Sequence, residues 1–276
     1  HDTYSRLLAS PDRDAFYDDY DFEVRPTTDD QPFFFHFFKW RQTPEILDNL
    51  GRTWQPFGGS GYFVLVALLV FAMVAAAAFV LLPVGLRGPF RRALRGHGPG
   101  RLARVLAYFA ALGLAYLLVE VATIQQFVLL LGQPTLAITT VLASLLLFSG
   151  VGSTYSERVP WSAALAGLVG VLAVWPWLLS AVSAIALPLP LGVRVAGAVL
   201  VLLPPGFLMG IPFARGLTAI RRDPELVPWA WAINGSASVI SAVVASLLAL
   251  SFGFRWVLWT GAALYALAWL TRPPRA

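Results

Sequence analysis

Glu120 is the residue with the strongest chemical implication, because it is the one carboxylate inside a long apolar stretch of the sequence. An ionised side chain in hydrocarbon is costly, so such residues face a protein interior and often mark an ion or proton path. Helical spacing puts Tyr116 and Thr123 on the face of Glu120. Two interpretations stay open: a protonated Glu120 hydrogen-bonded to a neighbouring helix, and a transport or proton site.

A second polar group is formed by Asn234, Ser238 and Ser241, which share one face at helical spacing. Small residues let helices approach closely in lipid, and their hydroxyls bond across the interface. We interpret this stripe as a helix-packing surface, with a ligand-lining role as the alternative. It is also the best predicted partner for Glu120. The stretch Ser149–Ser153 is interpreted in the same way.

The residue types present do not predict catalytic or metal chemistry. The sequence has no cysteine, which excludes disulfides, thiolate metal sites, iron–sulfur clusters and thiol nucleophiles. His1, His36 and His97 all lie outside the apolar stretches, so an intramembrane histidine cannot ligate haem or chlorophyll. No Ser/His/Asp set, carboxylate pair or phosphate cradle can be assembled. We expect no catalytic residue, no metal site and no cofactor.

The elements that must position these residues are transmembrane helices. Apolar residues make up 58% of the chain and charged residues 13%, whereas a soluble domain carries about 25% charged residues. The sequence predicts an all-α, polytopic transmembrane helix bundle of about seven spans in residues 61–276, behind an irregular extramembrane leader in residues 1–60. The predicted spans are Tyr62–Leu86, Leu102–Leu131, Thr135–Tyr155, Trp161–Ala184, Val193–Ala214, Pro228–Leu250 and Phe254–Leu270.

Prolines mark two of these spans. We expect Pro176 to bend the fourth span. We expect Pro204, Pro205 and Pro212 to interrupt the fifth span, which could expose backbone carbonyls to a cavity.

The leader carries most of the negative charge. Of the 15 acidic residues, 11 lie before residue 50, so the net charge of +5 does not indicate nucleic-acid binding. The aromatic run Phe33–Trp40 is too short to span a membrane and suits the headgroup region. We expect it to dock at the membrane surface, with a strand or helix packed in a soluble domain outside this sequence as the alternative.

The distribution of arginines predicts the orientation. The loops on one side of the predicted bundle hold twelve arginines, and the alternate loops hold two. The twelve are Arg87, Arg91, Arg92, Arg95, Arg101, Arg104, Arg158, Arg215, Arg221, Arg222, Arg272 and Arg275, and the two are Arg194 and Arg255. The split predicts that the leader lies outside and the C-terminus inside. The sequence starts at His1 and has methionine only at Met73 and Met209, so we expect a mature or trimmed piece of a longer gene product.

Several short stretches together carry a resemblance to a known family. They are Thr28–Phe35, Glu120 with Ile124 and Gln125, Leu131–Pro134, Ser149–Ser153, Met209–Phe213, Trp231–Ser238 and Gly253–Phe254. In this order they resemble the membrane part of bacterial spermidine-synthase-like integral membrane proteins, which join transmembrane helices to a polyamine aminopropyltransferase-like domain. The resemblance implies a bacterial cytoplasmic (inner) membrane, in which the arginine split places the leader in the periplasm and the C-terminus in the cytoplasm. In that family, the stretch corresponding to Thr28–Phe35 follows the catalytic domain. Gln31 stands where an arginine is expected, and the family's glycine-rich loop and catalytic aspartates have no counterpart here.

From these features we expect a non-enzymatic membrane domain that acts as an anchor or as an accessory or structural subunit of a larger membrane protein or complex. Its expected partners are the lipid bilayer and other membrane subunits or an upstream domain, not nucleic acid. One alternative is a carrier of protons or a polyamine-like cation that uses Glu120, which predicts a polar cavity at the midplane. The other is the membrane part of an aminopropyltransferase whose catalytic domain lies outside this sequence.

Overall fold

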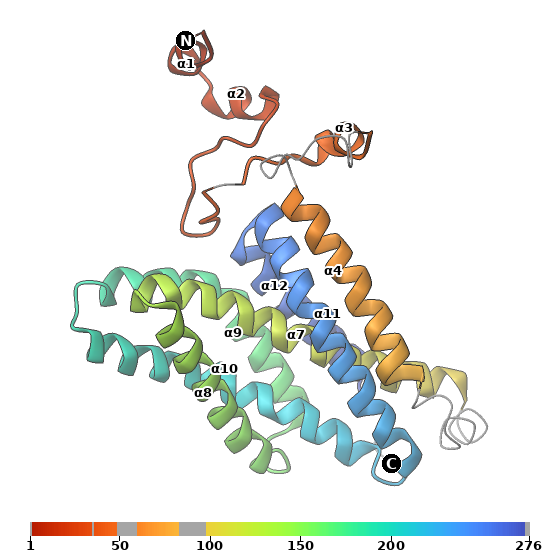
Figure 1. Ribbon diagram of the computed structural model, residues 1–276. Coiled ribbons are helices and arrows are strands. Elements are labelled where there is room, and N and C mark those ends of the chain that lie inside the picture. Colours follow the sequence, from red (N-terminus) through yellow and green to blue (C-terminus); the bar gives the residue numbers. More distant parts are fainter. Residues whose placement is uncertain (1, 35, 49–59, 83–97, 274–276) are drawn as a thin grey trace. The chain divides into compact units, whose positions relative to one another are not determined.

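A computed structural model describes residues 2–34, 36–48, 60–82 and 98–273 (Figure 1). The chain forms two compact units, His1–Ala67 and Leu68–Ala276. In the described ranges every regular element is helical, which confirms the all-α class. Five of the twelve arginines that predict the orientation, Arg87, Arg91, Arg92, Arg95 and Arg275, lie outside the described residues, as does the end of the first predicted span.

The first unit contains short helices where the sequence predicts an irregular leader. They are α1 (Asp2–Ala9), α2 (Arg13–Asp19), the 3-10 turn η1 (Trp40–Gln42) and α3 (Thr43–Asp48). Asp12 begins α2 as an N-cap, because its carboxylate accepts from the backbone N–H groups of Asp14 and Ala15 at 3.0 and 3.1 Å. The start of α2 is therefore stabilised by a residue of the leader itself.

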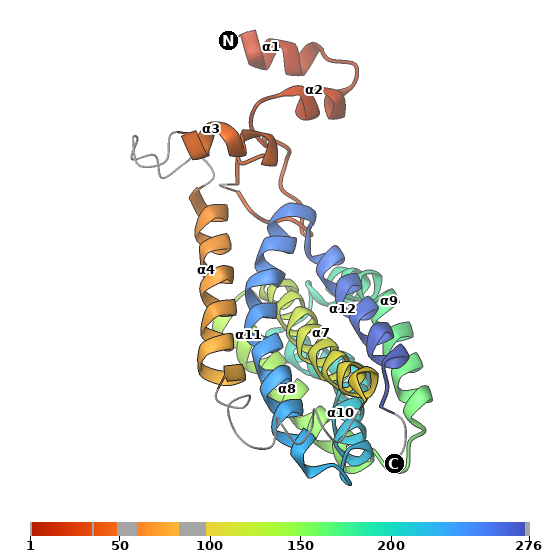
Figure 2. The same cartoon turned by 90° about the vertical axis from the view of Figure 1, so that its right-hand side faces the viewer.

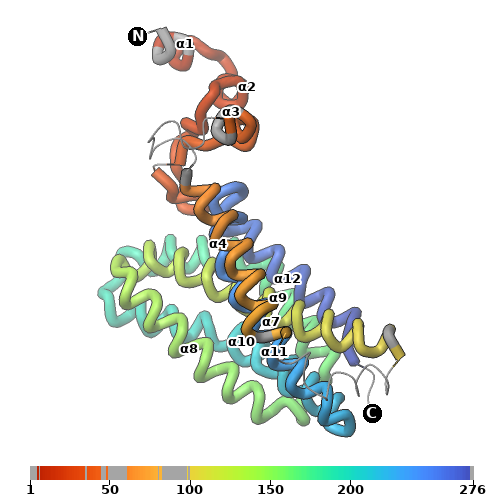
Figure 3. The backbone as a smooth tube through the Cα atoms, turned by 45° about the vertical axis from the view of Figure 1, so that its right-hand side comes forward, coloured from red at the N-terminus to blue at the C-terminus, as the bar shows by residue number. Residues whose placement is uncertain are grey.

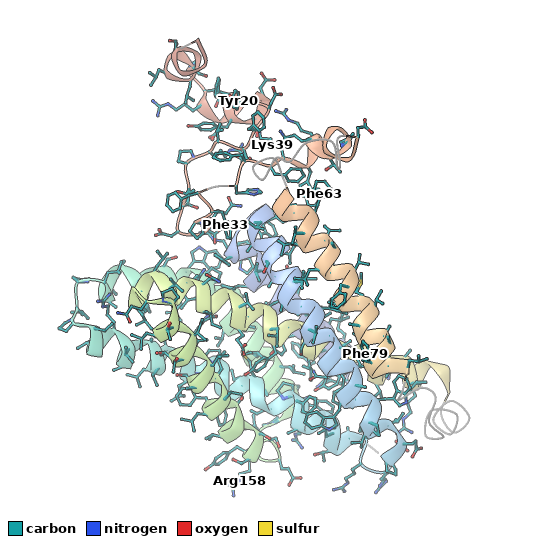
Figure 4. The ribbon with its side chains drawn as sticks, in the orientation of Figure 1. Tyr20, Phe33, Lys39, Phe63, Phe79 and Arg158 are labelled. Atoms are coloured by element: carbon teal, nitrogen blue, oxygen red, sulfur yellow. The ribbon has the colours of Figure 1, made fainter. Side chains whose placement is uncertain are left out.

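Lys39 holds the pieces of the first unit together, and Figure 4 shows its side chain beneath Tyr20. Its ammonium group donates to the carbonyl oxygens of Tyr17 and Tyr20 at 2.5 and 2.8 Å. Arg41 donates to the carbonyl of Asp19 at 2.9 Å. The last carbonyls of a helix have no partner within the helix, so these two cations cap the C-terminal end of α2.

The aromatic run packs on the first turn of α4 (Ser60–Ala76). Phe38 is buried, and its ring centroid lies 4.8 Å from that of Tyr62. The rings of Trp40 and His36 lie 4.9 and 5.1 Å from the same tyrosine. Burial lowers the pKa of His36, so the neutral imidazole is favoured in this cluster. The segment predicted to dock at the membrane surface is thus joined to the start of the first predicted span.

The second unit is a bundle of long helices (Figure 2). After the remainder of α4 it contains the π-helical turn η2 (Ala77–Leu81), α7 (Pro99–Leu131), α8 (Pro134–Thr154), α9 (Trp161–Ala186), α10 (Leu191–Ala219), the 3-10 turn η3 (Pro224–Leu226), α11 (Val227–Phe252) and α12 (Phe254–Leu270). Gly132, at φ 74°, ends α7, and Pro134 begins α8. Gly253, at φ 92°, separates α11 from α12. Glycine adopts positive φ without steric cost, and proline suits the first turn of a helix.

Six described helices are long and apolar enough to cross a membrane. They occupy Gly61–Phe79, Gly100–Leu131, Pro134–Thr154, Trp161–Ala186, Leu191–Ala219 and Pro224–Phe252. The seventh predicted span forms α12 with the predicted bounds, but it has 17 residues, which is at the lower limit of roughly 17–25 for a spanning helix. The chain is therefore an α-helical membrane protein.

The prediction that prolines interrupt the fifth span is wrong. α10 is one continuous helix that contains Pro204, Pro205 and Pro212. α9 is also continuous through Pro176, and the bend expected there stays a prediction. Each proline removes one N–H from the hydrogen-bond ladder. A fully unwound turn would leave several more backbone groups without partners in hydrocarbon, so the rest of the ladder is kept.

Glycines bring the helices of the second unit together in two close pairs. A Cβ atom at Gly152 of α8 or at Gly210 of α10 would lie 1.9 Å from a backbone oxygen of the facing helix. A Cβ at Gly113 of α7 would lie 2.3 Å from the carbonyl oxygen of Asn234 in α11. Only glycine fits such approaches, so α8–α10 and α7–α11 are two tightly packed pairs.

Described arginines join several segments at one end of the second unit. Arg101, at the start of α7, forms an ion pair with Asp223, which follows α10. Arg215 donates to the carbonyl of Val159 in the α8–α9 connection at 3.1 Å. The start of α7 and the connections after α8 and α10 therefore share one end, which we call the arginine-rich end.

The C-terminal segment reaches the same end. Arg272, after α12, lies 5.9 Å from the ring centroid of Trp161 at the start of α9. Arg194 instead donates to the carbonyl of Leu130 at the opposite end of α7, at 2.9 Å. Since α12 starts beside Gly253 and ends beside Trp161, it returns the chain to the arginine-rich end.

The glycine contacts predict a sharp difference between two positions in α8. Gly152→Ala should destabilise the bundle by about 1–3 kcal/mol, because the new methyl group overlaps a backbone oxygen that cannot move aside. Gly150→Ala is the matched control, since a Cβ there meets nothing within 4 Å. Thermal unfolding in detergent, followed by near-ultraviolet circular dichroism, should show a lower melting temperature for Gly152→Ala alone. Equal melting of the two variants would contradict the α8–α10 packing.

Candidate functional site

A cavity of about 610 Å³ lies between α7, α8, α10 and α11. It follows the seam between the two glycine-packed helix pairs, and Tyr265 of α12 also contributes to its wall. The lining contains tyrosine, serine and asparagine side chains together with apolar ones, and none of the lining residues is charged. The cavity is therefore a mixed polar and apolar space inside a membrane bundle.

The cavity extends from the arginine-rich end to the middle of α7. Ser153 and Leu217, which belong to its lining, lie close to the last residues of α8 and α10. Tyr116, also in the lining, lies near the midpoint of α7.

Three of the predicted site residues meet in this cavity: Tyr116, Asn234 and Ser238. The Asn234 side-chain amide donates to the carbonyl of Phe109 at 3.1 Å. The Ser238 hydroxyl lies 3.3 Å from the carbonyl of Gly113 and 3.0 Å from that of Asn234, and its single proton serves one of them at a time. Polar groups of α11 thus both join α11 to α7 and line the cavity.

Two other predicted residues serve helix packing away from the lining. Thr123 is buried and accepts from the indole N–H of Trp175 in α9 at 3.4 Å. Ser241 is also buried and donates to the carbonyl of Leu114 at 2.6 Å. The hydroxyl of Ser241 bonds across the helix interface, as the packing interpretation of the stripe predicts.

The prediction that Glu120 meets the Asn234 stripe is wrong. Asn234 and Ser238 bond to α7 with an offset of 125 residues and Ser241 with an offset of 127, so the two helices run parallel. The offset of 125 places Glu120 level with Ala245, about one turn beyond the last residue of the stripe. Glu120 is half-buried, and no described residue shares a hydrogen bond or ion pair with it. Tyr116 lies one helical turn before it on the same face of α7.

Ser149 and Ser153 of α8 both line the cavity, as the ligand-lining alternative for the stretch Ser149–Ser153 predicts, and their spacing of four residues puts them on one helix face. The sequence analysis missed other parts of the lining. Tyr265 is 1% exposed and gives no such signal, because it is an isolated polar residue in a short apolar helix. Phe213 and Trp231 form an aromatic pair in the wall, with ring centroids 4.8 Å apart.

The Tyr116 hydroxyl is a hydrogen-bonding group that the described part of the protein leaves unsatisfied. Its oxygen is buried beside the side chain of Ser149, without a well-aligned hydrogen bond. The Ser149 hydroxyl donates instead to the carbonyl of Leu146 at 3.2 Å. Buried polar groups normally have partners, so this hydroxyl can bond to an occupant of the cavity.

The lining of the cavity offers hydrogen bonds from hydroxyls and an amide. Carboxylate, imidazole and ammonium groups, which transfer protons near neutral pH, are not among its residues. Within the described ranges, no group of three or more His, Asp or Glu residues could hold a metal ion.

No known protein family, curated protein or solved structure matches this chain. Fold and site therefore define its class directly: a polytopic α-helical membrane bundle with an uncharged internal cavity.

Glu120→Gln tests whether the carboxyl group has a structural or a transport role. We expect the variant to change the free energy of unfolding by less than about 0.5 kcal/mol, because no hydrogen bond depends on the carboxyl group. Thermal unfolding in detergent and flux of protons and spermidine into vesicles containing the protein should both match the wild type. If the fold survives while a wild-type flux disappears, Glu120 is a carrier site.

Proposed function

We propose that this chain is a non-enzymatic membrane domain that anchors an extramembrane unit at the bilayer surface, as an accessory or structural subunit of a larger membrane protein or complex. The proposal rests on one observation: the leader packs on the start of α4. Lys39 caps α2, and the neighbouring aromatic run packs on Tyr62. A leader that packs on the first span in this way holds its binding partner near the start of that span.

The first unit also has apolar surface for a partner. Leu8 and Phe34 are 76% and 71% exposed, and Phe22, Phe37 and Trp40 are exposed as well. Exposed large apolar side chains on an extramembrane segment offer contact surface to a partner. The partner that we propose is another membrane subunit or an upstream domain of the same protein.

The resemblance to spermidine-synthase-like membrane proteins fits this proposal. Three of the stretches that carry the resemblance contribute residues to the cavity lining of the second unit. They are Ser149–Ser153, Met209–Phe213 and Trp231–Ser238. The alternative of an aminopropyltransferase requires a catalytic domain outside this sequence, so this chain would again be the membrane part.

The carrier alternative is favoured by one observation, the end of the cavity at Tyr116, one helical turn from Glu120. The lining itself offers no negative charge to balance a polyamine-like cation. Since a buried unpaired charge is costly, we rank the carrier behind the anchor.

We also propose that the leader faces the periplasm and the C-terminus the cytoplasm of a bacterial inner membrane. The support is the excess of arginine on one side of the bundle. Contacts of Arg101, Arg215 and Arg272 join segments at that same end. Short loops rich in arginine stay on the cytoplasmic side.

Photo-crosslinking in native membranes tests the anchor proposal. A photoreactive residue in place of Leu8 should give a discrete adduct with another polypeptide or with an upstream domain of the same protein. The same residue in place of Phe79, which is 80% exposed in the second unit, is the control and should react with lipid.

Lys39→Met should reduce the Leu8 adduct severalfold, since the ammonium group that caps α2 is lost, while the bundle melts as in the wild type. Only lipid adducts at Leu8, or an adduct unaffected by Lys39→Met, would refute the anchor.

Single-cysteine labelling tests the orientation, and the chain has no native cysteine to interfere. Gln133→Cys and Glu157→Cys are exposed positions at opposite ends of α8. A membrane-impermeant maleimide added outside intact cells should label Gln133→Cys and leave Glu157→Cys unlabelled until the membrane is permeabilised. The reverse pattern would mean that the arginine-rich end lies outside.

A further inference from the structure

We propose that the cavity between α7, α8, α10 and α11 binds an uncharged, membrane-derived lipid whose head carries hydroxyl or carbonyl groups, such as a diacylglycerol. This inference goes beyond anchoring and does not depend on it. It rests on four features of the described residues: a fixed space, an uncharged lining, unused hydrogen-bonding capacity and an opening in the apolar zone.

The space is held open by the packing around it. The α8–α10 pair cannot close further, because Gly152 and Gly210 already touch the facing backbone. Gly113 sets the same limit for the α7–α11 pair. Small residues on the cavity side, including Gly150 and Ala214, leave the seam between the pairs unfilled. The resulting 610 Å³ falls within the range of about 300–1,000 Å³ that is typical of ligand pockets.

The lining selects against charge. None of the lining residues is charged, and a charge moved from water into such a site must lose its hydration without gaining a counter-ion. A neutral molecule does not carry this cost. An ordinary phospholipid with a charged phosphate is therefore a poor occupant, and a lipid without phosphate is a good one.

The polar groups of the wall suit a hydroxyl or a carbonyl. Tyr116 has an uncommitted hydroxyl proton to donate. Ser149 and Ser238 donate their own protons to backbone carbonyls, which leaves their oxygens as acceptors. Asn234 uses one of its two N–H groups on Phe109, and an amide has a second N–H and an oxygen. A head group with both donors and acceptors can pair with these atoms.

The cavity opens in the apolar part of the bundle. Leu146 of α8 and Trp231 of α11 belong to the lining and are 65% and 58% exposed. They mark the rim on two different helices, α8 and α11, which Figure 3 draws in green and blue. Leu146 lies within the membrane-crossing part of α8, so the rim meets hydrocarbon there. An occupant can enter from the bilayer between α8 and α11.

Photoaffinity labelling of the full chain in lipid nanodiscs tests this proposal. The probe is diacylglycerol with a diazirine in one acyl chain, and the comparison probe is phosphatidylglycerol with the same chain. Mass spectrometry of the labelled peptides should place the diacylglycerol adduct on cavity segments of α8, α10 or α11. Unlabelled diacylglycerol should compete with it, and the phosphatidylglycerol probe should label these segments at least tenfold less.

Two variants make the test specific. Gly150→Leu should abolish the cavity adduct by filling open space, whereas Gly170→Leu in α9, outside the lining and equally free of close contacts, should not. Tyr116→Phe keeps the ring and removes the hydroxyl, so the adduct should fall about 3- to 10-fold. Unchanged melting temperatures would show that the variants fold.

Three outcomes would overturn the proposal. The first is equal labelling of the cavity by both probes, and the second is labelling spread over the outer faces of the helices. The third is an adduct that Gly150→Leu and Tyr116→Phe leave unchanged. Competition by water-soluble glycerol monoacetate as strong as that by diacylglycerol would overturn the membrane origin of the ligand.

Discussion

Hydrocarbon offers no hydrogen-bond partner, so every polar group inside the second unit depends on another part of the protein. Its deepest side chains show how this is met. The indole N–H of Trp161 donates to the hydroxyl of Tyr108 at 3.1 Å, and that hydroxyl donates to the carbonyl of Pro212 at 2.6 Å. This chain of bonds connects α9, α7 and α10. Polar side chains that reach a neighbouring helix therefore hold the helices together, whereas others, such as Ser180 and Ser246, bond to a carbonyl of their own helix.

The same constraint explains why a cavity forms where it does. A hydroxyl reaches a carbonyl of the next helix only when the two backbones are close, and glycine permits that approach. Gly113, Ser238 and Ser241 therefore act together on α7 and α11. Close contact within each pair is achieved with small residues, and small residues cannot also fill the seam between pairs. The cavity is the volume that remains between two well-packed surfaces.

The fold was predictable because hydropathy is a local property, and α12 has the predicted bounds. Whether prolines would interrupt α10 depended on the cost of unwinding in lipid rather than on proline propensity. Whether Glu120 would meet the Asn234 stripe depended on the offset between α7 and α11, and helical spacing within either helix cannot give that offset. Tyr265 entered the cavity from a separate helix, so no spacing in the sequence could link it to Tyr116.

Arg194 lies on the arginine-poor side of the bundle, and its contact gives the reason. It donates to the carbonyl of Leu130, near the end of α7, where helical carbonyls lose their intrahelical partners. Lys39 does the same for the end of α2 in the first unit. A cation at a helix C-terminus also interacts favourably with the helix dipole. Arg194 therefore has a local capping role at the end of α7. The distribution of the remaining loop arginines is what predicts the orientation.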